Sequence, residues 1–374
     1  MKSRSAKWAS IACACSSIIA PPAFGQGVAT APTLEQLQAQ VERRDAIISD
    51  LLQRVQSLEQ RLGASAGASA QPGAPPIAPR ARTEPQEAAD EALLERALER
   101  SLVLSGGAVL ARGQREIEPS IAYDFTQSSG LAAFGAGVVT RNFRRENLTA
   151  GLGLRAGLPW DSQVDIALPY AHQHVESVVE GVPRNSADSG IAGVQAALTH
   201  QFVNNRDARL AVLGSIAWLH SRDSASLRPL AAGLPDFAAP ASVGAGHDAL
   251  TARIAASKRL DPLVFVGSVS HAWNRADDVD GVRVKVGDAD GLSLRAILAA
   301  SPDVSLRAGF SFTRTGKSRV NGVPLEGTRA TASVFELGTS VVLNRNMLLD
   351  VYVGFGLTAE SPDFQLGVSI PIRF

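Results

Sequence analysis

The sequence has no run of 18 apolar residues, although 45% of its 374 residues are hydrophobic. A transmembrane helix needs about 20 consecutive apolar residues, so none is predicted. The chain also has no excess of either charge, because 36 lysines and arginines balance 36 aspartates and glutamates. A nucleic-acid-binding protein needs a basic surplus, so that class is excluded. The hydrophobic residues must therefore be distributed in a pattern other than one long run.

Cysteine occurs only at Cys13 and Cys15, inside a segment that resembles a secretory signal peptide. Residues 1–25 combine a basic start, a short apolar run and a small-x-small cleavage site at 23–25. Ser10 stands where a lipoprotein signal has an aliphatic residue, which argues against lipidation. The exported chain then has no cysteine, and hence no disulfide, thiol catalyst or thiolate metal site.

Enzyme signatures are missing as well. The glycines at 151, 153 and 157 lack the spacing and following helix of a dinucleotide loop. His172 and His174 share a strand face and could chelate a metal, but an aromatic and polar belt at the membrane interface explains them better. We therefore expect no cofactor and no enzymatic activity. An outer-membrane hydrolase or acyltransferase remains an alternative.

Residues 33–62 have the pattern of a coiled coil. Apolar residues follow alternating steps of three and four, with Arg44 as the polar interruption, and Gly63 ends the helix. This oligomerisation seam consists of Leu34, Leu37, Val41, Ile48, Leu51, Val55, Leu58 and Leu62. We expect homo-oligomerisation, as a dimer or a trimer. A lone helix on the rim of the next domain and a periplasmic export adaptor that docks a partner are the alternatives.

Two further segments follow the coiled coil. Residues 63–85 are rich in alanine, glycine, proline and serine and are predicted to be a flexible linker. Residues 86–104 are helical in pattern, with a slim apolar face formed by Ala92, Leu93, Ala97, Leu98 and Leu102. Because this helix directly precedes the first strand, it is a candidate lumen plug; a surface helix below the barrel is the alternative.

The rest of the chain, residues 115–374, shows the period-two alternation of β-strands. Twelve strands are predicted, at 115–127, 138–158, 162–177, 189–202, 207–221, 247–260, 262–274, 288–300, 303–315, 330–344, 346–358 and 363–374. Tight turns alternate with longer loops, of which 222–246, 275–287 and 316–329 are the clearest. This asymmetry is typical of a transmembrane antiparallel β-barrel of the bacterial outer membrane. A soluble β-sandwich would give similar alternation.

The last strand ends in an aromatic residue, Phe374. In this it resembles the C-terminal strand of bacterial outer-membrane barrels, which the barrel-assembly machinery recognises. The resemblance implies that Phe374 is an assembly signal. The signal peptide, this residue and the loop asymmetry together favour the barrel over the sandwich, with outer-membrane lipid around it and the coiled coil in the periplasm.

Charged residues alternate with the apolar ones along the predicted strands. A charge facing lipid at mid-membrane costs about 2–4 kcal/mol, so these residues are predicted to face the lumen. They are Glu116, Glu118, Asp124, Arg155, Asp165, Arg253, Arg295, Arg307, Glu336, Asp350 and Arg373. Structural ion pairs explain most of them better than a selectivity filter does.

The order of signal peptide, coiled coil, linker, helix and barrel resembles a known group. With the barrel opening at 106–123, Gly-Gly-Ala-Val-Leu-Ala-Arg-Gly-Gln-Arg-Glu-Ile-Glu-Pro-Ser-Ile-Ala-Tyr, it is similar to outer-membrane barrels of the phenol-degradation meta-pathway type, and among them to the Fap-type functional-amyloid secretion channels. That resemblance implies a trimer joined at 34–62 and a barrel plugged by 86–104.

The sequence thus predicts a gated outer-membrane channel. The resemblance favours export of a polypeptide, a functional-amyloid subunit. Uptake of small hydrophobic or aromatic compounds is the alternative, and neighbouring genes for amyloid subunits or for aromatic catabolism would separate the two.

Overall fold

The computed structural model describes residues 102–134, 137–179, 182–205, 208–221, 225–233, 240–301 and 303–374. The predicted signal peptide, the coiled coil at 33–62, the linker at 63–85 and residues 86–101 of the predicted plug lie outside these ranges and stay predictions. In the described part of the chain, no helix is both long enough and apolar enough to cross a membrane.

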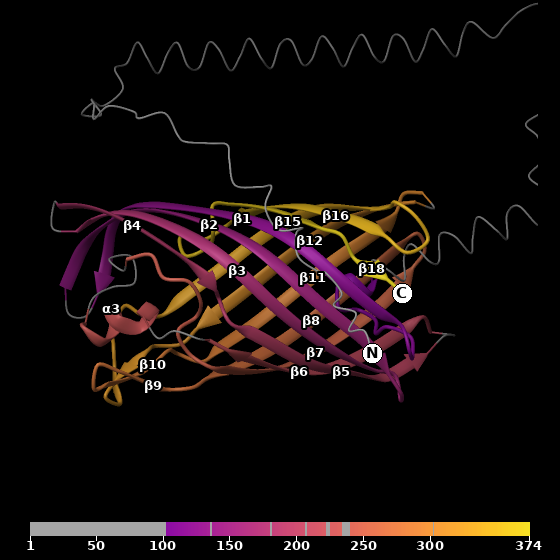
Figure 1. The fold of residues 1–374 in the computed structure, drawn as a ribbon, viewed down its shortest axis with the longest axis horizontal. Coiled ribbons are helices and arrows are strands. Elements are labelled where there is room, and N and C mark those ends of the chain that lie inside the picture. Colours follow the sequence, from indigo (N-terminus) through magenta and orange to yellow (C-terminus); the bar gives the residue numbers. More distant parts are fainter. Residues whose placement is uncertain are drawn as a thin grey trace, which may run out of the picture. The chain divides into compact units, whose positions relative to one another are not determined.

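The described chain folds into a closed antiparallel β-barrel (Figure 1). The first strand pairs with the second on one side and with the last two strand segments on the other, which closes the wall. The wall strands are β1 (Arg115–Phe134), β2 (Gly137–Leu158), β3 (Ser162–Val179), β4 (Val182–Ile191), β5 (Val194–Asn205), β6 (Leu210–His220), β7 (Ala249–Leu260), β8 (Leu263–Asn274), β11 (Ala289–Ala299), β12 (Val304–Thr315), β15 (Ala330–Val342), β16 (Leu348–Gly356), β17 (Phe364–Ser369) and β18 (Ile372–Arg373).

These fourteen strands occupy twelve positions, because β4 with β5, and β17 with β18, each continue along one path. The predicted twelve-strand all-β barrel is therefore confirmed. The β-sandwich alternative is wrong, because the sheet closes on itself instead of packing against a second sheet of the same size.

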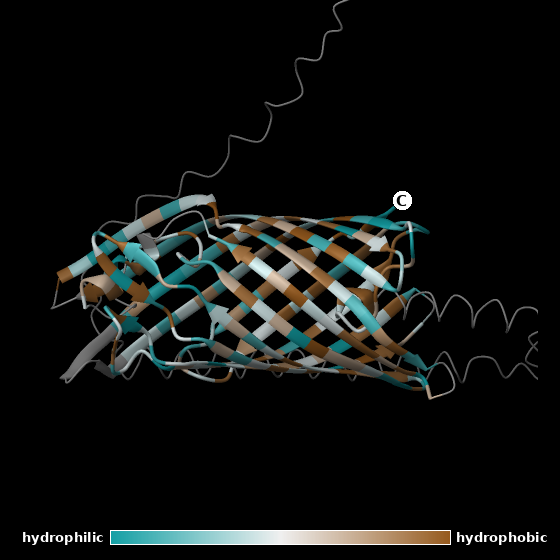
Figure 2. Ribbon diagram, turned by 90° about the horizontal axis from the view of Figure 1, so that it is seen from below, coloured by the Kyte–Doolittle hydropathy of each residue, from teal (hydrophilic) through white to brown (hydrophobic). Residues whose placement is uncertain are grey.

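Large apolar side chains cover the outside of this barrel. Ile121, Ile216 and Ile254 are 60%, 60% and 61% exposed, and many leucines, valines and aromatics accompany them. Apolar and polar residues alternate along the strands (Figure 2). Such an exterior would be costly in water, whereas lipid accepts it. The alternation that the sequence shows is thus the alternation between a lipid face and a lumen face.

The two ends of the barrel differ as predicted. Turns of a few residues join β2 to β3, β7 to β8 and β11 to β12, and both the start of β1 and the end of β18 lie at this end. Short turns mark the periplasmic end of outer-membrane barrels. At the other end, two predicted loops are strands instead: β1 and β2 stay paired up to Phe134 and Gly137, and β4 extends the wall over 182–191.

The strand β4 pairs with β3 alone, whereas β5 pairs with both β3 and β6. The chain changes partner at Ala192 and Gly193, where Gly193 has a φ of 148°. A Cβ at Gly193 would meet the carbonyl oxygen of His220 at 2.5 Å, so glycine allows β5 and the end of β6 to approach each other there.

The predicted extracellular loops carry structure of their own. β9 (Asp277–Val279), β10 (Val282–Lys285), β13 (Arg319–Val320) and β14 (Val323–Pro324) form a four-stranded sheet. The short helices η1 (Ala225–Leu227) and α3 (Arg228–Ala231) contribute Leu227 to a small core with Val279 and Val284. This sheet and α3 lie at one end of the barrel in Figure 1.

Candidate functional site in the barrel lumen

The segment that precedes β1 lies inside the barrel. Residues 102–104 are helical, and Leu102 packs against a buried cluster formed by Val264 and Val266 of β8 and Ile297 of β11. Val103 and Leu110 are almost fully buried. The end of the predicted plug helix therefore sits in an apolar pocket of the wall.

Hydrogen bonds fix this segment to the wall. Ser257 donates its Oγ hydrogen to the carbonyl of Gly107 (2.9 Å), and Arg295 Nη1 donates to the carbonyl of Ser105 (3.2 Å). The backbone N–H of Leu110 donates to Gln163 Oε1 (2.8 Å). These bonds hold residues 105–110 against β3, β7 and β11.

Glycine at position 157 makes room for the same segment. A Cβ there would collide with the carbonyl oxygen of Ala111, a backbone atom that cannot rotate away. Gly157 also donates its N–H to the carbonyl of Gln114 (2.9 Å) and accepts from Gly113 (3.0 Å). The inward glycines noted in the sequence thus include one that lets the chain enter the lumen.

Five of the predicted lumen charges meet in one network on β1, β2, β3 and β18. Arg155 contacts Glu116 (2.8 Å), Glu118 (2.6 Å) and Asp165 (3.3 Å). Arg373 contacts the other oxygen of Glu116 (2.9 Å), and the Glu116 side chain is only 2% exposed. Gln163 donates to Asp165 at 2.7 Å. Every carboxylate in this network has a guanidinium partner.

Three more of these charges form a second network, on β12, β15 and β16. Arg307 contacts Glu336 (3.0 Å) and Asp350 (3.2 Å). Ser340 donates its hydroxyl to Asp350 at 2.5 Å. Separately, Asp124 accepts a hydrogen bond from Gln365 at 2.9 Å. These groups too are satisfied within the barrel.

The two remaining predicted lumen charges, Arg253 and Arg295, differ from the others. Arg295 binds the carbonyl of Ser105 instead of a carboxylate. Arg253 has neither an ion-pair nor a hydrogen-bond partner among the described residues. A Cβ on Gly106 would lie 2.9 Å from its Nη1, so the guanidinium rests on the backbone at that glycine. Among the described residues, neither arginine has a carboxylate partner, and Arg253 also lacks a hydrogen bond.

The extracellular loop between β6 and β7 binds the upper part of the wall. The backbone N–H of Ser242 donates to Gln173 Oε1 (2.9 Å), and that of Val243 donates to Asp188 Oδ2 (3.0 Å). The N–H of Ala241 donates to Ser186 Oγ (2.7 Å). Three consecutive residues of the loop are thus fixed to β3 and β4.

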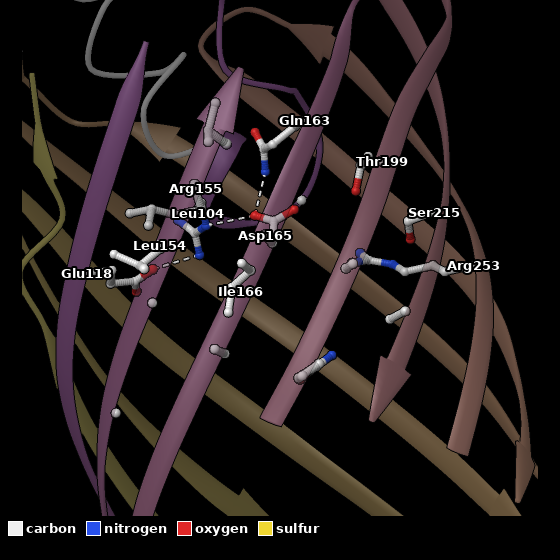
Figure 3. A pocket seen from close by; sticks show the side chains of 18 of the residues that line it. Leu104, Glu118, Leu154, Arg155, Gln163, Asp165, Ile166, Thr199, Ser215 and Arg253 are labelled. Atoms are coloured by element: carbon white, nitrogen blue, oxygen red, sulfur yellow. Dashed lines mark hydrogen bonds and ion pairs between the residues drawn. The ribbon is translucent and has the colours of Figure 1, made fainter. Parts of the chain in front are cut away.

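A cavity of about 710 Å³ lies along the inner wall. Its polar lining includes Glu118, Arg155 and Asp165 of the Arg155 network, and also Gln163, Thr199, Ser215 and Arg253 (Figure 3). Its apolar lining includes Val103 and Leu104 of the entering segment and the alanines at 167, 197 and 217. The cavity is therefore amphipathic, with one charged face and one face of small apolar groups.

The described residues contain no group of three histidines, cysteines, aspartates or glutamates that could hold a metal ion. His174 contacts Glu176 at 3.4 Å at the outer surface. On the outer face, His220 lies next to Trp218 and His271 next to Trp273. Tryptophan and histidine side chains suit the membrane interface, being apolar in body and polar at one edge.

Of the other predicted residues, the seam residues from Leu34 to Leu62 and Ala92, Leu93, Ala97 and Leu98 of the plug lie outside the described ranges. Phe374 is 62% exposed, and its backbone pairs with that of Arg115 where the barrel closes (3.0 and 3.3 Å). Its role in assembly stays a prediction. Sequence reasoning missed Ser105, Gly107 and Ser257, which are small residues without a charge or motif to mark them.

A closed antiparallel barrel with an apolar exterior and a polar interior satisfies all its backbone hydrogen bonds between strands, as a membrane requires. The chain is accordingly a bacterial outer-membrane β-barrel protein. No family model matches the sequence.

Solved structures share this fold. An outer membrane channel from Pseudomonas putida F1 is similar over 72% of this chain and 98% of its own, with 15% identity and a TM-score of 0.55. The translocator domain of the autotransporter NalP from Neisseria meningitidis covers 77% of this chain and 97% of its own, with 11% identity and a TM-score of 0.41. The CymD monoaromatic hydrocarbon channel covers 71% and 88%, with 12% identity and a TM-score of 0.34.

Proposed function

We propose that this protein is an outer-membrane channel for small hydrophobic or aromatic compounds. The amphipathic cavity of about 710 Å³ carries this proposal. Binding sites for small molecules commonly measure about 300–1,000 Å³ and combine apolar walls with a few placed polar groups. A compound with the bulk of a substituted aromatic ring fits such a space.

Export of a polypeptide ranks second. The resemblance to the Fap-type channels favours it, but a polypeptide would have to pass the segment at 102–110, which is held by three hydrogen bonds and an apolar pocket. A small molecule needs no displacement of this segment to enter the cavity. The solved channel from Pseudomonas putida F1 supports a channel fold but not a choice of cargo.

The test is uptake of the fluorescent hydrophobic probe N-phenyl-1-naphthylamine by cells that carry the full chain. Expression is expected to raise the uptake rate several-fold over the empty vector. Ala217 lines the cavity, so Ala217→Trp should fill it and return uptake to the vector level. The matched control is Ala252→Trp. Ala252 lies on the neighbouring strand, opposite the lipid-facing Ile216. This variant should keep wild-type uptake. Equal uptake by cells with the wild-type protein and with the vector would refute the proposal.

A further inference from the structure

The cavity holds a cation whose charge nothing in the described chain balances. The arginines of the two ion-pair networks each contact at least one carboxylate, and Arg295 is used to bind Ser105. Arg253 has no such partner. A half-buried guanidinium without a counterion costs free energy that a bound anion would offset. This makes Arg253 the place in the cavity where an anionic group is best stabilised.

The strand register surrounds Arg253 with hydrogen-bonding groups. Thr199, Ser215 and Arg253 lie directly opposite one another on β5, β6 and β7, and Ser270 follows on β8. Gln163 of β3 is opposite Thr199. Residues opposite each other in antiparallel strands share a face. The guanidinium therefore sits in a row of hydroxyl and amide groups that runs across five wall strands.

The next row toward the extracellular end is small and largely apolar. Ala197, Ala217, Thr251 and Ala272 lie opposite one another on β5, β6, β7 and β8. The row on the periplasmic side, by contrast, contains Leu213 and Ala255, both of which are buried. The cavity next to Arg253 thus borders the alanines on one side, and Leu213, Ala255 and the entering segment on the other.

Figure 3 shows the arrangement from inside the cavity. Arg253 extends from its strand toward the Arg155 network, with Thr199 and Ser215 beside it. The dashed ion pairs join Arg155 to Asp165 and to Glu118, and none ends on Arg253. An anionic head at Arg253 and an apolar body over the alanine row would use both faces of the cavity.

We propose that the cavity binds amphiphilic carboxylates, with the carboxylate on Arg253 and the hydroxyls of Thr199 and Ser215, and the apolar body against Ala197 and Ala217. This rests on the proposed function and names its cargo class. A guanidinium binds a carboxylate with two parallel hydrogen bonds, which an amide or alcohol of the same shape cannot match.

The experiment uses the full chain in lipid nanodiscs and two probes of equal shape, 4-phenylbutanoate and its uncharged amide. Isothermal titration calorimetry, with empty nanodiscs as the blank, should show tighter binding of the carboxylate. Arg253→Gln should weaken carboxylate binding about ten- to a hundredfold, the usual cost of losing a hydrogen bond to a charged group, and leave amide binding within about twofold. Arg253→Lys should restore part of the affinity.

The control variant is Arg283→Gln, on an exposed position of β10 outside the cavity, which should bind both probes as the wild type does. Equal binding of the two probes, or no effect of Arg253→Gln, would overturn the carboxylate proposal and leave the channel for hydrophobic compounds standing. Absence of binding for both probes together with failed uptake of the naphthylamine would refute the proposed function itself. A further outcome would overturn the carboxylate proposal. If carboxylate binding is seen only after deletion of residues 86–101, the partner of Arg253 in the full chain is a carboxylate of the chain itself.

Discussion

Two parts of the same wall hold their charges in different ways. On β1, β2 and β3, Arg155 is shared by three carboxylates, and one of them, Glu116, is shared with Arg373. On β7 and β11, Arg253 contacts no carboxylate of the described residues, and Arg295 binds a backbone carbonyl. Both parts face the same cavity.

The difference separates charges that hold the barrel together from charges that are available to something else. A network in which each acid has a cation leaves little attraction for a ligand, and its members are costly to remove. A cation without an acid contributes little to folding, but it attracts anions into a cavity with low dielectric walls. Position in the lumen alone therefore does not tell which role a charge has.

The largest expected loss of stability comes from replacing Arg155. Arg155→Met leaves Glu116, Glu118 and Asp165 without their shared cation, and removing one partner of a buried pair costs about 3–5 kcal/mol. We expect the free energy of unfolding in detergent to fall by that amount, measured by urea titration and by the temperature at which the folded band is lost in gels. Arg144→Met is the control, because the Arg144 and Glu146 side chains are 49% and 30% exposed and such pairs contribute about 0–1 kcal/mol. Equal loss for both variants would contradict the distinction.

The second prediction concerns the segment that enters the lumen before β1. Deleting residues 86–104 removes Leu102 from its pocket on Val264, Val266 and Ile297 together with the predicted plug. Single-channel conductance in planar bilayers is expected to rise severalfold if the predicted plug occupies the lumen. Deleting the linker at 63–85, a segment of similar length, should leave conductance unchanged. An unchanged conductance in the first deletion would show that the predicted helix is only a connector.

Replacing Arg253 tests the part of the wall on β7 and β11, where the described residues give the cation no carboxylate partner. Because Arg253 has no counterion in the described chain, and a half-buried cation without one costs free energy, Arg253→Met should not lower the free energy of unfolding. The same urea titration measures it, beside Arg155→Met. A loss as large as that of Arg155→Met would mean that Arg253 stabilises the barrel and is not held free for a ligand.

The sequence predicted the transmembrane strands well because lipid on one side and water on the other impose alternation on every strand. It failed where both faces of a strand are in a polar environment. β4 has the sequence Val-Pro-Arg-Asn-Ser-Ala-Asp-Ser-Gly-Ile, which has no apolar face, and so residues 182–188 were predicted as a loop. Residues 128–134 of β1 were also missed.

Contacts in the lumen were predictable only where a tight turn fixes the register. The short turn after β2 places Arg155 opposite Asp165, and this follows from counting outward from residues 159–161. The pairing of Glu116 with Arg155 depends on the register between β1 and β2. That register is set at the far end of the two strands, in a region that was predicted to be a loop. The absence of a partner for Arg253 in the described chain depends on the register of several strands at once. No local sequence pattern predicts it.

The last prediction concerns the extracellular end, where a charge is paired but largely solvated. Asp288 accepts hydrogen bonds from Lys285 Nζ (3.0 Å) and from the backbone N–H of Asn274 (2.9 Å). Partial burial raises the pKa of Asp288, but the hydrogen bonds of Lys285 and Asn274 and the charge of Lys285 outweigh it and hold the pKa below its usual value. A carboxyl whose pKa is lower in the folded state stabilises that state above its unfolded pKa, and the stabilisation is lost as the pH falls through the folded pKa.

Asp288→Asn should therefore lower the free energy of unfolding by less than about 1 kcal/mol at neutral pH and by nothing once the wild-type carboxyl is protonated. Urea titrations of the two proteins at pH 7 and in the acid range below the usual aspartate pKa measure this difference. A gap that stays constant or widens in acid would show that the Asp288 contact does not depend on its charge, and that even the paired charges outside the lumen act by geometry alone.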